Sequence, residues 1–386
     1  MNNPAILSTL VERSMRHLSE RTTDQSEATM ELPVSDYLDD AIWRREMEAL
    51  FMRRPLVLGY SAELKAPGDY RALTIRKIPV LLVRGKDGVA RAFLNACRHR
   101  GTQLLTDGCG HAMRFACPYH AWTYDAQGAL VGVYLEKQFG DLDKRERGLT
   151  QLSCVERAGI IWGVLIPGVP LDIDAWLGTY APVLESLQIG EWHVAERRSL
   201  PGPNWKVAFD GYMEGYHFNV LHRPSVGKDT KGTMLGDQFG LHQRLVFARE
   251  GLRGFSDPDA LPAVADAVFP VHIIYPNVSI AGGYQDQMLI SQVLPGDTID
   301  TSLTLMTILS RKPIDNDDKQ RERMRKYADY IQAVIRDEDY LAADRIQATL
   351  RSGANRTFLI GRNEYPLQHF HRCLKQHRDA DLPQAR

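Results

Sequence analysis

The 386-residue sequence has almost no net charge, with 47 lysines and arginines against 48 acidic residues. It therefore lacks the field of one sign that would attract nucleic acid or a membrane surface. It also lacks any apolar run of the roughly 18 residues that a membrane-spanning helix needs. Met1 to Ser19 mixes Glu12, Arg13 and Arg16 with apolar residues, which favours a short amphipathic helix over a secretory signal peptide.

Cysteine is scarce as well, and the chain has five: Cys97, Cys109, Cys117, Cys154 and Cys373. Two of them belong to the motif described next, and the other three form an odd set. A disulfide framework is therefore not expected, and we predict a reducing, cytoplasmic location. The composition, 44% hydrophobic and 25% charged, is that of an ordinary globular protein, and the length is sufficient for two domains.

Two short loops each offer one thiolate and one imidazole. Cys97 and His99 form the first pair, Cys117 and His120 form the second, and seventeen residues separate His99 from Cys117. Such loops can hold a [2Fe–2S] cluster with both cysteines on one iron and both histidines on the other. Neutral imidazoles lower the negative charge of the cluster, so that its reduction becomes easier. The alternative is a structural zinc site, although zinc ligands more often come as a cysteine pair plus a histidine pair.

Periodicity and turn signals divide the chain into three parts. Residues 1–51 are predicted to be helical and to pack on the C-terminal domain. Residues 52–165 form an all-β domain of short strands. Its clearest signals are strands at 79–84, 89–94 and 160–166 and hairpin turns at 85–88 and 125–128.

Residues 166–386 form the third part, a C-terminal domain. We expect a helical segment at 172–187, β-like segments at 271–279, 287–294 and 302–309, and one long helix or two joined helices at 316–350. Residues 223–262, rich in glycine, aspartate and proline, are assigned no element. The predicted fold class is α+β, an all-β domain followed by an antiparallel sheet covered by helices.

A second candidate site surrounds two histidines. His217 and His222 are five residues apart, and Glu214 precedes the first by three. Two histidines and one carboxylate can hold ferrous iron with one face open. On a regular helix His222 would point about 140° away from His217, so both reach one metal only if the helix bends or ends near them. Pro224 is consistent with an ending. Taken alone, such a pair is a weak signal, and structural histidines are the better interpretation of it.

A third ligand is sought in the predicted helix 316–350. Its apolar stripe consists of Met324, Tyr327, Ala328, Ile331, Ile335, Ala342 and Ile346. Glu338 and Asp339 both fall within the arc of that stripe, which is unusual for carboxylates unless they are paired or bind metal. Periodicity does not choose between the two, and either could instead extend to water at the helix flank.

The order of these motifs resembles the α subunit of the Rieske non-haem iron oxygenases over nearly the whole chain. The shared features are Cys-x-His, Cys-x2-His, Asn-Trp-Lys, an acid three residues before a His-x4-His pair, and Glu-Asp late in the chain. The resemblance implies one [2Fe–2S] cluster on Cys97, His99, Cys117 and His120, and one Fe²⁺ on His217, His222 and Asp339. Asp339 is chosen because the residues around it match the family pattern Glu-Asp-x4-Glu-x2-Gln, with Asp344 in place of the second glutamate.

The resemblance also assigns a role to Glu214. In the family, an acid at this position connects an iron histidine of one subunit to a cluster histidine of the next. The ring-hydroxylating dioxygenases usually carry aspartate there, whereas glutamate is found in members similar to carnitine monooxygenase. Asp210 is a second candidate for hydrogen bonding to the histidine ligands.

Three functions remain open. The first is a terminal oxygenase that uses electrons from the cluster and O₂ at the iron to hydroxylate an organic, preferably aromatic, substrate. The second is a monooxygenase or demethylase of the same build that acts on a non-aromatic or quaternary-amine substrate. The third, a pure electron-transfer protein, would need neither His217 nor His222. Phe209 and residues 223–295 are expected to form the substrate pocket.

The resemblance implies several partners. The sequence has no glycine-rich dinucleotide fingerprint, so a separate NAD(P)H-dependent flavin reductase would supply electrons, directly or through a ferredoxin. We expect a head-to-tail homotrimer, with or without a separate β subunit.

Overall fold

The computed structural model describes residues 4–254, 267–283, 285–314 and 317–380. These residues form two compact units. The first, here called the β unit, comprises residues 48–176 and 188–191, and the second, the mixed unit, comprises residues up to 47, 177–187 and 192–380. Within the described ranges, no helix combines the length and apolar character needed to cross a bilayer.

The β unit contains three antiparallel sheets. The first has the strand order β10-β5-β4-β3-β6, the second β11-β12-β2 and the third β7-β8-β9. The strands are β2 Leu56–Tyr60, β3 Asp69–Ile75, β4 Ile78–Arg84, β5 Ala90–Leu94, β6 Gly108–His111, β7 Arg114–Ala116, β8 Thr123–Asp125, β9 Leu130–Gly132, β10 Gln151–Leu152, β11 Cys154–Arg157 and β12 Ile160–Gly163.

Both predicted hairpins of the β unit are present. β4 and β5 pair with Arg84 opposite Ala90, and the turn at 85–88 connects them. The second turn joins β8 to β9, where the Asp125 carboxylate accepts hydrogen bonds from the backbone N–H groups of Gln127 and Ala129, both at 2.9 Å. Gly128 adopts a φ of +85°, which favours a residue without Cβ. The predicted strand 160–166 is shorter than expected, because β12 ends at Gly163.

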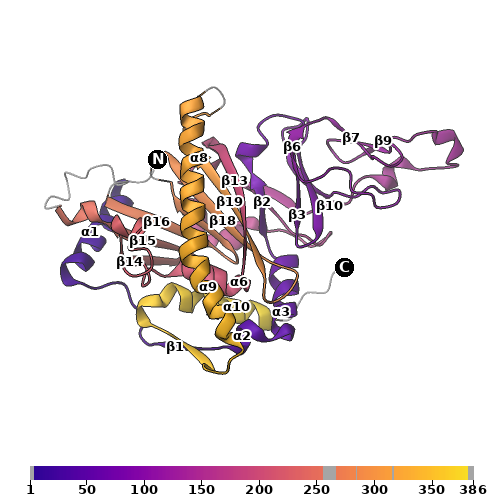
Figure 1. The fold of residues 1–386 in the computed structure, drawn as a ribbon. Helices are drawn as coiled ribbons and strands as arrows, with labels where there is room; N and C mark the ends of the chain where they lie inside the picture. Colours follow the sequence, from indigo (N-terminus) through magenta and orange to yellow (C-terminus); the bar gives the residue numbers. More distant parts are fainter. Residues whose placement is uncertain (1–3, 255–266, 284, 315–316, 381–386) are drawn as a thin grey trace. The chain divides into compact units, whose positions relative to one another are not determined.

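The mixed unit is built on one seven-stranded antiparallel sheet in the order β13-β19-β18-β17-β16-β15-β14. Its strands are β13 His193–Gly202, β14 Thr230–Phe239, β15 His242–Arg249, β16 Val268–Ile274, β17 Val278–Gly282, β18 Gln287–Pro295 and β19 Ser302–Ser310. A long helix crosses one face of this sheet (Figure 1), formed by α8 Asp318–Val334, the π-helical turn η11 Ile335–Tyr340 and α9 Leu341–Leu350. The α+β class and this long helix are confirmed.

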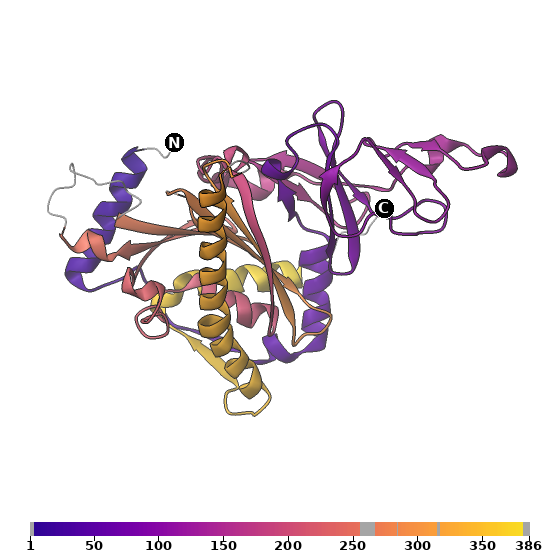
Figure 2. The ribbon, with the colours of Figure 1, turned by 45° about the horizontal axis from the view of Figure 1, so that its top comes forward.

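The remaining helices are short, apart from α1 and α10. They are α1 Pro4–Glu20, α2 Ser35–Leu38, α3 Asp40–Glu46, the π-helical turn η1 Met47–Met52, α4 Ile173–Leu177, α5 Ala181–Glu185, α6 Trp205–Asp210 and α10 Tyr365–Asp379. The prediction of helix at 172–187 is confirmed as two short helices, α4 and α5, which a 3₁₀ turn at Gly178–Tyr180 connects. Figure 2 shows α1 beside the sheet, where Leu10 and Val11 pack on Leu235 and Val246 of β14 and β15.

Three expectations differ from the structure. The N-terminal 51 residues are not helical throughout, because β1 Met30–Pro33 pairs with the distant β20 Thr357–Ile360. The segment 271–279 forms two strands, β16 and β17, since Pro276 in the turn between them has no N–H to donate. Residues 230–249 form β14 and β15, although no strand was expected there. A register shift between Thr230 and Met234 interrupts the alternation that would have indicated a strand, and residues 255–262 lie outside the described ranges.

Candidate metal centres

The two Cys/His loops of the β unit share one backbone geometry. In the first, the N–H of Cys97 donates to the carbonyl of Thr102 and the N–H of Gly101 to the carbonyl of Cys97, both at 2.8 Å. In the second, Cys117 donates to Trp122 at 2.8 Å and Ala121 donates to Cys117 at 2.9 Å. Gly101 and Ala121, each four residues after its cysteine, both have positive φ angles, +80° and +56°. The loops therefore present their ligands in the same way.

The four side chains of these loops converge within the β unit. Cys97 and Cys117 are both buried, and burial together with the adjacent Cys117 raises the pKa of the Cys97 thiol. The rings of His99 and His120 lie 4.8 Å apart between centroids. Nδ1 of His120 is buried without a hydrogen-bond partner among the described residues, as expected of a nitrogen that binds metal.

A single zinc ion fits these residues less well than a cluster does. In the described parts of the chain, one group of at least three histidine, cysteine or acidic side chains lies close enough together to share a metal ion. It consists of His217, His222 and Asp339. The four ligands of the β unit do not form such a group in the described part of the chain. A two-iron cluster spans a larger space and divides its ligands between two metals.

Tyr124 is a residue of this site that sequence reasoning missed. Its hydroxyl oxygen accepts a hydrogen bond from the N–H of Arg98 at 2.9 Å and lies 3.3 Å from Sγ of Cys97. Since the oxygen already accepts from Arg98, its own hydrogen is available for the sulfur. Such a bond stabilises negative charge on a ligand thiolate. No local motif marks Tyr124, because β8 brings it to the site from 27 residues along the chain.

In the mixed unit, the Asn-Trp-Lys motif anchors α6 just before the second site. The side-chain oxygen of Asn204 accepts from the N–H groups of Lys206 at 2.8 Å and Val207 at 3.4 Å and so caps the helix. Trp205 and Lys206 are buried, and the Lys206 ammonium pairs with the Glu46 carboxylate at 2.7 Å. These contacts hold the helix whose end leads into the histidine segment.

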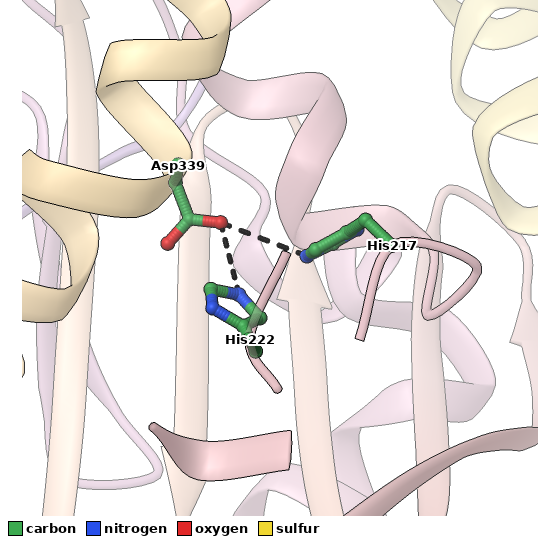
Figure 3. A group of neighbouring side chains, drawn as sticks. All are labelled: His217, His222 and Asp339. Carbon is green, nitrogen blue, oxygen red and sulfur yellow. Dashed lines mark ion pairs between the residues drawn. The ribbon is translucent and has the colours of Figure 1, made fainter. Parts of the chain in front are cut away.

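Helical structure ends at Met213, so His217 and His222 lie in a segment of turns. Glu214 has an extended backbone, with φ −144° and ψ 160°. The change of direction brings both histidines to Asp339 (Figure 3). Oδ1 of Asp339 lies 3.1 Å from Nε2 of His222 and 3.6 Å from Nε2 of His217. One ligand atom from each of the three residues falls within 4.8 Å of the other two, which is compatible with a shared metal ion.

Each of these histidines is also held by a second carboxylate. Nδ1 of His217 contacts the carboxylate of Glu214, which also accepts from the N–H of His217 at 3.2 Å. Nδ1 of His222 lies 2.6 Å from Oε2 of Glu338. A proton on Nδ1 leaves Nε2 free to bind metal, and the acid fixes the orientation of the ring. Burial lowers the pKa of His222, but Asp339 and Glu338 outweigh it and raise that pKa above its ordinary value.

The π-helical turn η11 explains why periodicity could not choose between Glu338 and Asp339. An α-helical turn gives consecutive residues directions about 100° apart, whereas a π-helical turn departs from this spacing. Both carboxylates reach the histidines, Asp339 at Nε2 and Glu338 at Nδ1. Glu338 is therefore a positioning residue that the sequence analysis left without a role.

Asp210 is not part of this arrangement, contrary to the sequence-based expectation. Its carboxylate accepts a hydrogen bond from the Tyr37 hydroxyl at 2.5 Å and lies 3.0 Å from Nε2 of His371. Asp210 ends α6, four residues before the backbone changes direction at Glu214, and thus contacts α2 and α10 instead. It does not hydrogen-bond to either histidine of the triad.

A cavity of about 410 Å³ opens beside His217, His222 and Asp339. One wall consists of alternate residues of β17 and β18, among them Ser279, Ala281, Leu289 and Ser291, because alternate side chains of a strand share one face. The opposite wall belongs to the long helix and includes Tyr327, Ile331 and Ile335, which sequence reasoning missed. Phe209 is not among the lining residues and instead packs on Phe370.

Two family models match the chain in the order in which the sites occur. Residues 54–143 match the Rieske [2Fe-2S] domain, and residues 189–379 match the catalytic domain of the ring hydroxylating alpha subunit. The chain is a Rieske oxygenase α subunit. Both cofactors expected from the sequence, the [2Fe–2S] cluster and the mononuclear iron, are confirmed for these domains.

Characterised members of the family resemble the chain to different extents. The carnitine monooxygenase oxygenase subunit of Escherichia coli K12 is 29% identical over 367 residues, which cover 89% of this chain and 93% of that protein. The glycine betaine monooxygenase oxygenase subunit of Pseudomonas aeruginosa PAO1 is 33% identical over 192 residues, 50% of this chain and 44% of that protein. Biphenyl 2,3-dioxygenase subunit alpha of Rhodococcus jostii RHA1 is 37% identical over 200 residues, which cover 50% of this chain and 43% of that protein. The matches thus span less than half the length of the latter two relatives.

Solved structures show the same fold. The quaternary ammonium Rieske monooxygenase CntA in complex with L-carnitine superposes with a TM-score of 0.77 at 23% identity, over 91% of this chain and 96% of that one. Naphthalene 1,2-dioxygenase from Rhodococcus bound to indole gives a TM-score of 0.74 at 19% identity, over 97% of this chain and 99% of that one. At these identities the likeness concerns the fold alone.

Proposed function

We propose that this Rieske oxygenase α subunit is the terminal component that introduces oxygen into an organic substrate. One observation carries the proposal: the ligand atoms of His217, His222 and Asp339 converge within 4.8 Å at the side of a largely apolar cavity. Two histidines and one carboxylate leave a face of the metal open, and here that face adjoins space for a substrate. A pure electron-transfer protein would require neither feature.

The residues of the two sites bind different cofactors. Cys97, Cys117, His99 and His120 would hold the cluster, and His217, His222 and Asp339 the iron. When bound, the cluster supplies single electrons and the iron binds O₂ beside the substrate. The protein contributes orientation, since Glu214 and Glu338 hold the two imidazoles by Nδ1 and leave both Nε2 atoms directed at the metal position.

Electron transfer would run between copies of the chain. Tyr119, Tyr134, Leu135 and Phe139 are large, exposed apolar side chains of the β unit near its Cys/His loops. On the mixed unit, Tyr216 and Val220 are exposed in the segment that carries the iron histidines. Exposed apolar groups of this kind favour association. In a head-to-tail trimer, Glu214 would link His217 to a cluster histidine of the adjacent copy.

External electrons require a partner protein. A separate NAD(P)H-dependent flavin reductase would reduce the cluster, directly or through a ferredoxin. A separate β subunit would be an additional component of the assembly and would contribute no residue to either metal site.

Two substrate classes are supported by specific observations. Phe218, Phe247, Phe269 and Tyr327 line the cavity, and aromatic side chains suit the packing of an aromatic substrate. Aromatic rings also attract quaternary ammonium groups. This second class is favoured by the relatives named for carnitine and glycine betaine and by glutamate rather than aspartate at position 214.

The proposal is tested on the purified protein with its reductase. We expect about two cluster irons plus one further iron per chain, and a reduced paramagnetic signal with the low average g value of histidine-ligated clusters. Candidate substrates should stimulate oxygen uptake, and label from ¹⁸O₂ should appear in the product by mass spectrometry. A colourless protein that contains zinc, or products without the label, would refute the proposal.

A further inference from the structure

Arg249 provides the one arginine or lysine side chain among the described residues that line the cavity. It is the last residue of β15, and its guanidinium lies 5.4 Å from the ring centroid of Phe269. Nη1 donates to the Asp229 carboxylate at 3.0 Å. Nε, by contrast, is buried and has no hydrogen-bond partner in the described part of the chain. The guanidinium is therefore the one cationic group of the described lining, with Nη1 paired and Nε closed off from solvent.

The position of Arg249 relative to the iron histidines follows from strand geometry. Phe247 precedes it by two residues in β15, so both side chains point to the same face of the sheet. Phe247 stacks on Phe218 with 4.7 Å between centroids. Phe218 in turn contacts the rings of His217 and His222 at 4.9 and 5.3 Å. The backbone of Arg249 therefore lies roughly 7 Å further along β15 than that of Phe247, whose ring packs on Phe218 next to the iron histidines.

The charge around Arg249 favours an anionic ligand. The side chain of Asp229 is 67% exposed and that of Arg249 17%, so water screens the acid much more than the guanidinium. The other acids of the cavity, Glu214 and Asp339, belong to the iron end. A carboxylate accepts two parallel hydrogen bonds from one edge of a guanidinium, a pairing that water cannot match.

We infer that Arg249 binds a carboxylate of the substrate and holds the opposite end of the molecule at the iron. The inference rests on the proposed function, whose substrate class it narrows to organic carboxylic acids with an apolar, aromatic or trimethylammonium body. Phe269, Phe247 and Phe218 contact this body between the two ends. A neutral hydrocarbon or an amine without a carboxylate offers the guanidinium no charged acceptor, which disfavours both.

Matched ligand pairs test this binding without turnover. The oxidised, iron-loaded protein is titrated calorimetrically, without reductase, with 4-phenylbutanoate and 4-phenylbutanamide, and with γ-butyrobetaine and its amide. At least one of the acids should bind at least about tenfold more tightly than its amide, as expected for hydrogen bonds to a charged group. Arg249→Gln should reduce the affinity for the acid to that for the amide. Arg249→Lys should retain part of the preference for the acid, because a lysine keeps the charge but lacks the planar guanidinium.

Lys231→Gln is the matched control. Lys231 pairs with Glu250 at 2.9 Å and is not among the lining residues, so the same change of charge there should leave the preference intact. The visible spectrum of the cluster and the thermal midpoint show whether each variant is folded. The inference is overturned if neither acid binds more tightly than its amide in the parent protein, or if the preference survives in Arg249→Gln.

The calorimetric test separates this inference from the proposed function. Labelled oxygen in a neutral or cationic product, without any preference for acids, would overturn the role of Arg249 and leave the oxygenase intact. Arg249-dependent binding of acids in a protein that consumes no oxygen would support the anion site and refute the oxygenase.

Discussion

The carboxylate of Glu338 lies 2.6 Å from Nδ1 of His222 and accepts a hydrogen bond from the Ser225 hydroxyl at the same distance. Glu214 occupies the corresponding place on His217. The two acids come from different elements, Glu338 from the π-helical turn η11 and Glu214 from the segment after α6. Each iron histidine is therefore oriented independently, and each orientation can be disturbed without removing a ligand.

Glu338→Gln should weaken iron binding about 10–100-fold, the range typical of residues that orient metal ligands. The amide cannot balance the proton on Nδ1 of His222 with a full charge. Ser225→Ala is the control, because it removes the other donor to Glu338 and keeps the acid, so a smaller loss is expected. Iron titration of the metal-depleted protein measures both. Parent affinity in Glu338→Gln would show that the contact has no role in the metal site.

His217→Ala and His222→Ala should each lose the mononuclear iron and all turnover while the visible spectrum of the cluster is retained, because the two sites share no ligand. Metal analysis and absorbance of the same samples give both results. Asp210→Asn is the control and should keep its iron, since Asp210 contacts Tyr37 and His371 rather than the triad. Loss of iron in Asp210→Asn would contradict the placement of this acid outside the site.

His272 of β16 should make the protein less stable in acid. It is buried, neither ring nitrogen has a partner among the described residues, and burial lowers its pKa to about 3. The unfolded chain, with a histidine pKa of about 6.5, binds one more proton between these values. The free energy of unfolding therefore falls as the pH falls through this range, by about 1.4 kcal/mol per unit.

His272→Leu removes that proton from the unfolded state. Between pH 7 and pH 5, the free energy of unfolding measured in urea should fall by about 2 kcal/mol less in the variant than in the parent in the same metal state. Identical pH profiles in the two proteins would mean that His272 is protonated in the folded state as well.

Glu214→Gln should assemble both metal sites and keep the oligomeric state of the parent. If Glu214 bridges an iron histidine and a cluster histidine of the adjacent copy, loss of its charge should slow reoxidation of the cluster by O₂ and substrate at least about a hundredfold. Reduction by the partner reductase should remain near the parent rate. Rapid mixing of the pre-reduced variant measures the step, with Asp210→Asn as the control. Parent rates in Glu214→Gln would show that its charge has no role in electron transfer and that its contact with His217 only orients the ring.

Local patterns were sufficient wherever the determining contacts are local. The hairpin at Gly85–Gly88 and the two Cys/His loops depend on residues adjacent in the chain. The shared metal required the helix to end or bend near the histidines, but it ends at Met213, eleven residues before Pro224, the residue that was taken as the signal. The resemblance, rather than periodicity, selected Asp339 over Glu338.

Features that depend on distant partners could not be predicted. Met30–Pro33 is a strand only because Thr357–Ile360 lies beside it. Tyr124 reaches Cys97 through the pairing of β8 with its neighbours, and Arg249 reaches the cavity through the order of seven strands. The π-helical turn that directs both Glu338 and Asp339 at the histidines has no signature in a single sequence. These residues carry much of the specific chemistry.

Reoxidation of the pre-reduced cluster in Asp339→Ala tests the central claim most directly, namely that the iron held by His217, His222 and Asp339 consumes oxygen with electrons from the cluster. Parent and variant are reduced anaerobically and mixed with O₂ and a substrate found by oxygen uptake, and the cluster absorbance is followed. We predict that the parent cluster reoxidises rapidly with formation of labelled product. The Asp339→Ala cluster should remain reduced over the same period, because the variant lacks the iron. Reoxidation of the variant at the parent rate with equal product would contradict the account.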